Sequence, residues 1–243
     1  MTPNKTPTAT PFGPRCAPPG TARTCRPDAV QLVLVRHALP ELVRGASSGK
    51  ADPPLTPHGR AQADRLVAAL GAGSAAGADS GVAGLYTSPM SRARDTAAPL
   101  AAALGVPPTV VDDLREYDAE VAHYVPVHEM AQLDPGAWDR IRAGLLPAYV
   151  DVPAFTARVT GALERVVAAH EGRATAVVVA HAGVINTWLA HLLGIARPLA
   201  FPLDYAGITR VVAARDGRRS VRTVNEIAHV ADLLTSVAGT TEG

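Results

Sequence analysis

The sequence predicts an α/β fold, namely a doubly wound, mostly parallel sheet flanked by helices, with a C-terminal hairpin. Two runs, 31–35 and 176–180, are apolar apart from Gln31, and they have the length and composition of strands that are buried on both faces. Helical periodicity alternates with these strand candidates, which is the order that gives parallel sheets. The first run leads into Arg36 and His37, and the second into His181. Because such sheets bind ligands beyond the carboxyl ends of their strands, we expect both histidines at one site.

A length of 243 residues suits one α/β domain with extensions, or two small domains, and 47% hydrophobic residues are enough for a sizeable core. We expect a tail at 1–29, one main domain at 30–230 with an insertion at 117–153, and a tail at 231–243; this main domain is the candidate catalytic domain. The formal net charge of +1 gives no indication of a nucleic acid or an anionic membrane as partner. No apolar run approaches the roughly 18 residues of a membrane span, and the N-terminus lacks the apolar core of a secretory signal. These features predict a cytoplasmic protein.

The N-terminal tail is rich in Pro, Thr, Ala and Arg and shows no helical or strand period, so we expect it to be disordered. It holds both cysteines of the chain, Cys16 and Cys25, far from the two histidines. They can pair, but incidental thiols are the favoured interpretation, and no disulfide framework is implied.

Local signals predict the helices and the remaining strands. Thr56 and Pro57 supply an N-cap and a first-turn proline for a helix over 57–70. Ser88 and Pro89 repeat this pair before a helix that runs to Leu104. Further elements are predicted as strands at 84–87 and 109–111, helices around 155–166 and 185–192, and a hairpin with strands at 207–214 and 219–224 around Asp216-Gly217.

A metal site is one alternative for the histidines, since His with Asp or Glu forms common metal ligand sets. The neighbouring arginines argue against it, because fixed positive charge repels a divalent cation. The chain also has no His-x-x-x-His or Cys-x-x-Cys spacing. We therefore expect no bound metal.

Arg36-His37-Ala38 after a hydrophobic strand resembles the Arg-His-Gly signature of the histidine phosphatase superfamily, the phosphoglycerate-mutase-like enzymes. Segments 55–63 and 88–97 are similar to that family's Leu-Thr-x-x-Gly-x-x-Gln-Ala and Ser-x-x-x-Arg-Ala-x-x-Thr-Ala elements, and 114–116 resembles its Leu-x-Glu element. The resemblance extends over residues 30 to about 230. It implies the fold of this family and a phosphatase chemistry that needs no metal or organic cofactor.

The resemblance also implies a role for each site residue. His37 would be the nucleophile that forms phosphohistidine. Arg36, Arg92 and His181 would hold the phosphoryl group, which suits the fork geometry of two guanidiniums. Glu116 would protonate the leaving oxygen and then activate water.

Position alone adds one phosphate contact and leaves other assignments open. Ala182 is expected at the start of a helix, where its amide can donate a hydrogen bond to the phosphoryl group. Arg92 lies in a first helical turn, where an arginine opposes the helix dipole unless an anion binds, whereas Arg94 suits the surface. Asp113 and Asp118 lie near Glu116 in the sequence and are alternatives to it as the general acid. Side-chain alternation along an extended segment could point Glu116 toward the site, but Leu114 would then share its side, so this support is weak.

The segment after His37 departs from the family pattern. Leu39 and Pro40 follow where a hydroxyl residue usually contacts phosphate, and Ser47 or Ser48 is the candidate substitute. The insertion at 117–153 is predicted to be a lid or specificity region, with a locally packed helical excursion as the alternative.

We expect a phosphomonoester hydrolase that acts on a small phosphorylated metabolite. The alternatives are a phosphoglycerate-mutase-type isomerase and a non-catalytic phosphate-binding scaffold. Hydrolysis is favoured because the insertion is short and the mutase-like residues after His37 are absent. The expected partner is the small phosphorylated substrate. The sequence does not determine the oligomeric state, and a dimer is one of the options.

Overall fold

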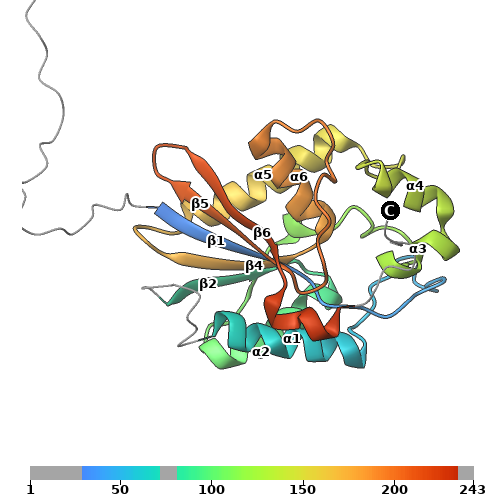
Figure 1. The fold of residues 1–243 in the computed structure, drawn as a ribbon, viewed down its shortest axis with the longest axis horizontal. Helices are drawn as coiled ribbons and strands as arrows, with labels where there is room; N and C mark the ends of the chain where they lie inside the picture. The colour runs from blue at the N-terminus through green and yellow to red at the C-terminus, as the bar shows by residue number, and fades with distance from the viewer. Residues whose placement is uncertain (1–28, 72–80, 235–243) are drawn as a thin grey trace, which may run out of the picture.

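The computed structural model describes residues 29–71 and 81–234, so Cys16, Cys25 and nearly all of the predicted tail at 1–29 lie outside the described residues. Six strands form one sheet in the order β3-β2-β4-β1-β5-β6, with helices on both faces (Figure 1). The strands are β1 (Ala29–Arg36), β2 (Val82–Thr87), β3 (Thr109–Val110), β4 (Thr175–Ala180), β5 (Ile208–Ala214) and β6 (Arg219–Glu226). The helices are α1 (Pro57–Leu70), α2 (Ser91–Leu104), α3 (Val127–Leu133), α4 (Pro135–Arg142), α5 (Val152–Ala168) and α6 (Ala182–Leu193), with 3-10 helices η1 (Asp112–Leu114) and η2 (Ala228–Leu233). The predicted fold class is confirmed.

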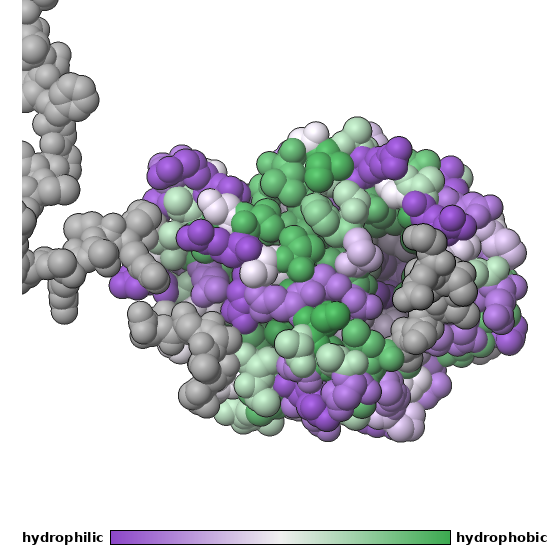
Figure 2. All heavy atoms as spheres, viewed as in Figure 1, coloured by the Kyte–Doolittle hydropathy of each residue, from purple (hydrophilic) through white to green (hydrophobic). Residues whose placement is uncertain are grey.

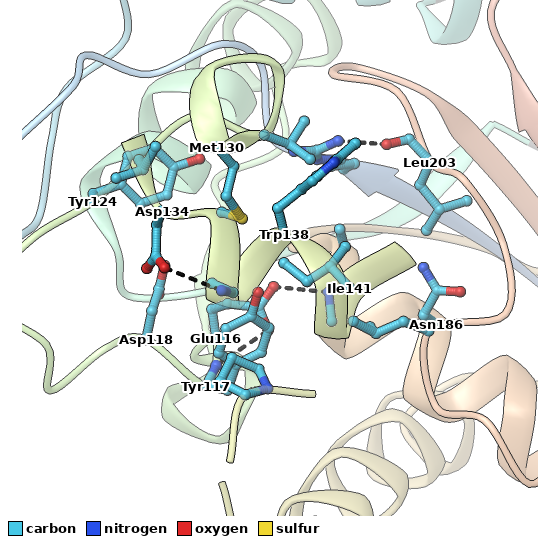
Figure 3. Close-up of a pocket in the computed structure, with 18 of the residues that line it drawn as sticks. Glu116, Tyr117, Asp118, Tyr124, Met130, Asp134, Trp138, Ile141, Asn186 and Leu203 are labelled. Carbon is cyan, nitrogen blue, oxygen red and sulfur yellow. Dashed lines mark hydrogen bonds between the residues drawn. The ribbon is translucent and has the colours of Figure 1, made fainter. Parts of the chain in front are cut away.

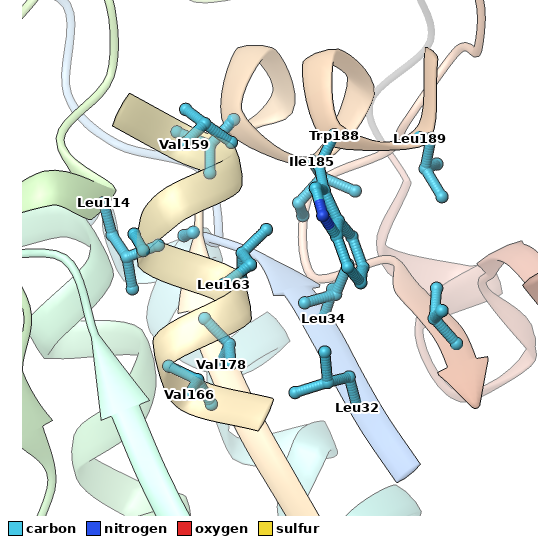
Figure 4. Close-up of a cluster of buried hydrophobic side chains, with 14 of the residues drawn as sticks. Leu32, Leu34, Leu114, Val159, Leu163, Val166, Val178, Ile185, Trp188 and Leu189 are labelled. Carbon is cyan, nitrogen blue, oxygen red and sulfur yellow. The ribbon is translucent and has the colours of Figure 1, made fainter. Parts of the chain in front are cut away.

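Strand β1 lies inside the sheet, between parallel β4 and antiparallel β5. Its side chains alternate between two cores: Leu32 and Leu34 pack with α5 and α6, whereas Val33 and Val35 pack with α1 and α2. Figure 4 shows Leu32 and Leu34 beside the indole of Trp188. Because both faces are covered, β1 is continuously apolar from Leu32 to Val35, as the sequence indicates.

The register of β1 and β4 brings the two histidines together. Arg36 pairs with Ala180 across this parallel ladder, so His37 and His181 follow at neighbouring positions. The amide of His37 also donates to the carbonyl of Ala180 at 2.9 Å. The site therefore forms at the carboxyl ends of adjacent strands, where the sequence predicts it.

Helix α1 begins as predicted, since the Thr56 side chain accepts a hydrogen bond from the amide of Gly59 at 2.8 Å. The cap predicted for α2 is wrong. This helix begins at Ser91 after Met90, whose side chain makes no capping hydrogen bond. The amide of Ser91 donates instead to Oδ1 of Asp52 at 2.8 Å. Ser88 instead follows β2, where its hydroxyl lies 2.8 Å from Nε2 of His181. A residue predicted to have a local role thus contacts the histidine pair.

Two boundaries differ from the prediction. Strand β3 comprises only two exposed residues, and the chain then turns into η1 rather than staying extended toward Glu116. At the other end, η2 packs against α1, and Nε2 of Gln62 donates to the carbonyl of Leu233 at 2.7 Å. The folded chain therefore continues beyond Val230. Within the two described ranges, no helix has the length and apolar character needed to cross a membrane.

Candidate active site

His37 is 3% exposed, and its Nδ1 lies 2.8 Å from the carbonyl oxygen of Ala38. Because a carbonyl oxygen can only accept, this contact places the ring proton on Nδ1 and the lone pair of a neutral ring on Nε2. Burial, followed by the charges of Arg92 and Arg36, lowers the pKa of His37 well below its usual value. The ring is therefore neutral at pH 7, with a nucleophilic nitrogen at Nε2.

Two arginines bring positive charge to His37. Arg36 donates to the carbonyl of Leu203, and its guanidinium lies 3.8 Å from the ring centroid of Tyr205. Arg92 is fully buried, and its Nη2 lies 2.7 Å from Oδ1 of Asp118. Among the described residues, Nε of Arg36 and both Nε and Nη1 of Arg92 have no hydrogen-bond partner. Since buried donors are normally satisfied, these free N–H groups indicate a place for the oxygens of an anion.

His181 is fully buried, with its ring centroid 5.1 Å from that of His37. Its Nε2 contacts the Ser88 hydroxyl, whereas its Nδ1 has no partner among the described residues. Burial and the charge of Arg92 lower its pKa well below the usual value, so it too is neutral. His181 does not line the cavity, but the following residue, Ala182, does. As the first residue of α6, Ala182 has an amide that no carbonyl within the helix accepts.

Glu116 reaches the same cavity from the segment after η1 (Figure 3). One carboxylate oxygen accepts from the amide of Tyr117 at 3.1 Å, and the other from the amide of Gly183 at 2.8 Å. Burial, reinforced by the negative charge of Asp118, raises the pKa of Glu116 to about 7. A Cβ on Gly183 would lie 2.4 Å from the carboxylate, so this position requires glycine. Leu114 and Glu116 are both buried, although Leu114 enters the core from a 3-10 helix rather than from a strand.

Segment 55–63 does more than begin a helix. Gln62 accepts from the amide of Leu39 at 3.0 Å, and Thr96 on α2 accepts from the amide of Ala38 at 2.9 Å. A Cβ on Gly59 would lie 2.0 Å from the carbonyl oxygen of Leu39. The backbone after His37 is therefore fixed by two helices. The prediction of a capped helix for this segment is thus incomplete, and the family-like positions of its glycine and glutamine were the available signal.

The predicted hydroxyl substitute is also wrong. Ser47 and Ser48 are exposed, and the Ser48 hydroxyl donates to the carbonyl of Lys50 at 2.9 Å. Arg94 is exposed, as predicted. Sequence reasoning missed Tyr205 beneath Arg36, for which no local motif exists. It also missed the pairing of Asp118 with Arg92, although both residues were under consideration.

The candidate active site encloses a cavity of about 490 Å³. One side is lined by the end of β1 and by neighbouring residues of α2, α6 and the segment after η1, namely Arg36, His37, Arg92, Ala182 and Glu116. The insertion at 117–153 provides much of the opposite wall. Figure 2 shows the surface hollowed near the end of the molecule that carries α3 and α4. Within residues 29–71 and 81–234, no group of three or more His, Cys, Asp or Glu side chains is arranged to hold a metal ion.

Comparisons with known proteins agree with this geometry. The chain is 30% identical over 209 residues to the "Bifunctional protein Rv2228c" of Mycobacterium tuberculosis, a match that covers 82% of this chain and 55% of the relative. The chain thus spans about half the length of the curated relatives it matches.

Solved structures show the same fold at lower identity. "Bacillus stearothermophilus YhfR" is 24% identical, with a TM-score of 0.65 over 83% of this chain and all (100%) of that chain. A mycobacterial glucosyl-3-phosphoglycerate phosphatase, Rv2419c, is 24% identical, with a TM-score of 0.62 over 81% of this chain and 99% of that chain. An alpha-ribazole phosphatase from Shigella flexneri is 24% identical, with a TM-score of 0.57 over 81% and 96% of the two chains.

The family model that matches the chain spans residues 32–226, from the first buried strand to the end of β6. It therefore includes both histidines, both arginines and the buried glutamate of the cavity. The chain belongs to the histidine phosphatase superfamily (branch 1).

Proposed function

We propose that this protein hydrolyses phosphomonoesters through a phosphohistidine on His37. The observation that carries the proposal is the state of that histidine. Its Nδ1 contacts the Ala38 carbonyl, which leaves the lone pair on Nε2. The charges of Arg92 and Arg36, which both have N–H groups without a partner among the described residues, act on this ring. A neutral nucleophile surrounded by fixed positive charge is what transfer of an anionic phosphoryl group requires.

In the first step, Nε2 of His37 forms a bond to phosphorus as the bond from phosphorus to the ester oxygen breaks. Arg36, Arg92 and the Ala182 amide hold the non-bridging oxygens and stabilise the charge that spreads over them. We assign His181 the same role: its ring centroid lies 5.1 Å from that of His37, and its Nδ1, which has no partner among the described residues, would donate to one of these oxygens. The proton of Glu116 passes to the leaving oxygen and releases the alcohol.

In the second step, water attacks phosphorus and gives a proton to the Glu116 carboxylate. The N–P bond breaks, its electron pair returns to Nε2 of His37, and inorganic phosphate leaves. A pKa of about 7 lets Glu116 act as an acid in the first step and a base in the second at neutral pH.

The isomerase alternative has less support from the cavity. A phosphoglycerate carries a carboxylate besides its phosphate and needs a second cationic site. Apart from Arg36 and Arg92, the described lining holds one Lys or Arg side chain, the exposed Arg142. The scaffold alternative leaves the neutral His37 and the raised pKa of Glu116 without a use.

The test is turnover of p-nitrophenyl phosphate, with isomerisation of phosphoglycerate measured in parallel. We expect phosphate release without isomerisation. His37→Ala should abolish release, and the control His191→Ala, at an exposed position on α6, should retain it. Isomerisation that outpaces hydrolysis, or equal activity of the two variants, would overturn the proposal.

A further inference from the structure

The cavity extends well beyond the place for a phosphoryl group. Ligand pockets of about 300–1,000 Å³ enclose whole organic ligands, so a cavity of about 490 Å³ has room for the organic part of a substrate. The wall opposite the sheet is formed by α3, α4 and the segment at 199–205. We call this the distal wall, and its side chains decide which organic group fits.

The distal wall is apolar where it faces the cavity. Figure 3 shows Met130 of α3, Trp138 and Ile141 of α4, and Leu203 among the residues that line the cavity. Neither α3 nor α4 buries any side chain fully. Trp138 and Ile141 are three positions apart and so share one helical face. Met130, Trp138 and Ile141 therefore remain half-buried without a ligand, whereas Leu203 is already buried. An apolar ligand group would complete the burial of the three.

Three polar side chains in or next to the distal wall already have partners in the protein. Asn186 both donates to and accepts from the backbone of Phe201, at 2.9 and 2.8 Å. Asp134 caps α4 through the amide of Ala137 at 3.0 Å. Asp204 accepts from Asn225 at 2.7 Å. These groups fix the wall and offer few free hydrogen bonds to a ligand.

Charge in the distal wall disfavours a second anion. Asp134 and Asp204 are acidic, against the single exposed cation of Arg142. His128 has a buried Nδ1 without a partner among the described residues, and burial lowers its pKa, so it is neutral at pH 7. The cavity is therefore cationic at the His37 end and apolar and uncharged to weakly acidic at the other.

We infer that the substrates are monophosphates of flat, uncharged aromatic groups, which lie against Trp138 and between Met130, Ile141 and Phe201. This inference rests on the proposed hydrolase function. It excludes small metabolites with a second anionic group, such as phosphoglycerates, as preferred substrates, because they would leave the apolar wall exposed and meet no second cationic site.

The test compares two alkyl esters with similar leaving groups, 2-(1-naphthyl)ethyl phosphate and ethyl phosphate. Since their leaving alcohols need similar protonation, the ratio of their kcat/KM values reports contacts with the organic part. We expect a ratio of about 100, within the range that apolar pocket contacts give. Trp138→Ala should lower this ratio about tenfold. The control Leu133→Ala, at a 38% exposed apolar residue of α3 outside the cavity lining, should leave it unchanged.

A binding measurement separates this inference from the hydrolase proposal. The chain has two tryptophans, and Trp188 is fully buried. The non-hydrolysable 2-(1-naphthyl)ethylphosphonate should therefore quench fluorescence from Trp138, and Trp138→Phe should remove the quenching while calorimetry still detects binding. If no ester is hydrolysed but the phosphonate binds in this way, the hydrolase proposal fails and the preference for an aromatic group stands. A kcat/KM ratio near one, or tighter binding of 3-phosphoglycerate, would overturn the inference.

Discussion

Replacement of Glu116 by Gln should change how the rate depends on the leaving group and on pH. Glu116 has a pKa of about 7, and the pH dependence of kcat/KM reports the pKa of the essential acid in the free enzyme. For an alkyl phosphate, whose leaving oxygen needs a proton, kcat/KM should fall about tenfold per pH unit above pH 7. Glu116→Gln should lower this rate by about 10²–10⁴-fold and remove the pH dependence above pH 7. p-Nitrophenyl phosphate, with its good leaving group, should be much less affected.

The assay measures kcat/KM for both esters from pH 5 to 9 and uses their ratio, which largely cancels ionisation of the phosphate itself. Asp113→Asn is the matched control, because Asp113 pairs with Arg165 and does not line the cavity. If Glu116→Gln slows both esters equally, or if Asp118→Asn shows the leaving-group dependence instead, then Glu116 is not the general acid.

Other consequences of the site can be measured directly. Arg92→Lys should retain a charge for Asp118 but lose the free Nε and Nη1 donors. Its kcat should therefore fall far more than that of the control Arg94→Lys, on the exposed side of α2. Equal effects would show that Arg92 does not bind the phosphoryl group. The raised pKa of Glu116 means that folding stability falls as pH rises from about 4.5 to about 7, by at most roughly 3 kcal/mol. The Tm of Glu116→Gln minus that of the parent should therefore be larger at pH 8 than at pH 5. The same difference at both pH values would contradict the raised pKa. Turnover should survive EDTA, because arginines supply the charge that a metal would provide, and loss of activity that one divalent metal restores would refute this.

The parts of the structure that local sequence patterns determine were predictable. The Thr56 cap and the proline after it define the start of α1, and the apolar runs of β1 and β4 define two buried strands. General rules for parallel sheets then place His37 and His181 together without knowledge of any contact. This is why the centre of the site follows from the sequence.

The parts that depend on contacts between distant segments were not predictable from local patterns. Asp118 meets Arg92 across 26 residues, and Ser88 meets His181 across 93. A local rule assigned Ser88 to a helix cap, but packing of β2 beside β4 gives its hydroxyl a histidine partner instead. The distal wall depends on how α3 and α4 fold over the sheet, which no periodicity in 117–153 indicates.

The most direct test of the mechanism is the chemical location of the phosphoryl group during turnover. Rapid quenching with labelled substrate, followed by peptide mapping, should place acid-labile, base-stable phosphate on the peptide that contains His37. His37→Ala should carry no label, and the peptide with His181 should carry none in either protein. Label on His181, or acid-stable label on a hydroxyl such as that of Ser88, would contradict the assignment of His37 as the nucleophile.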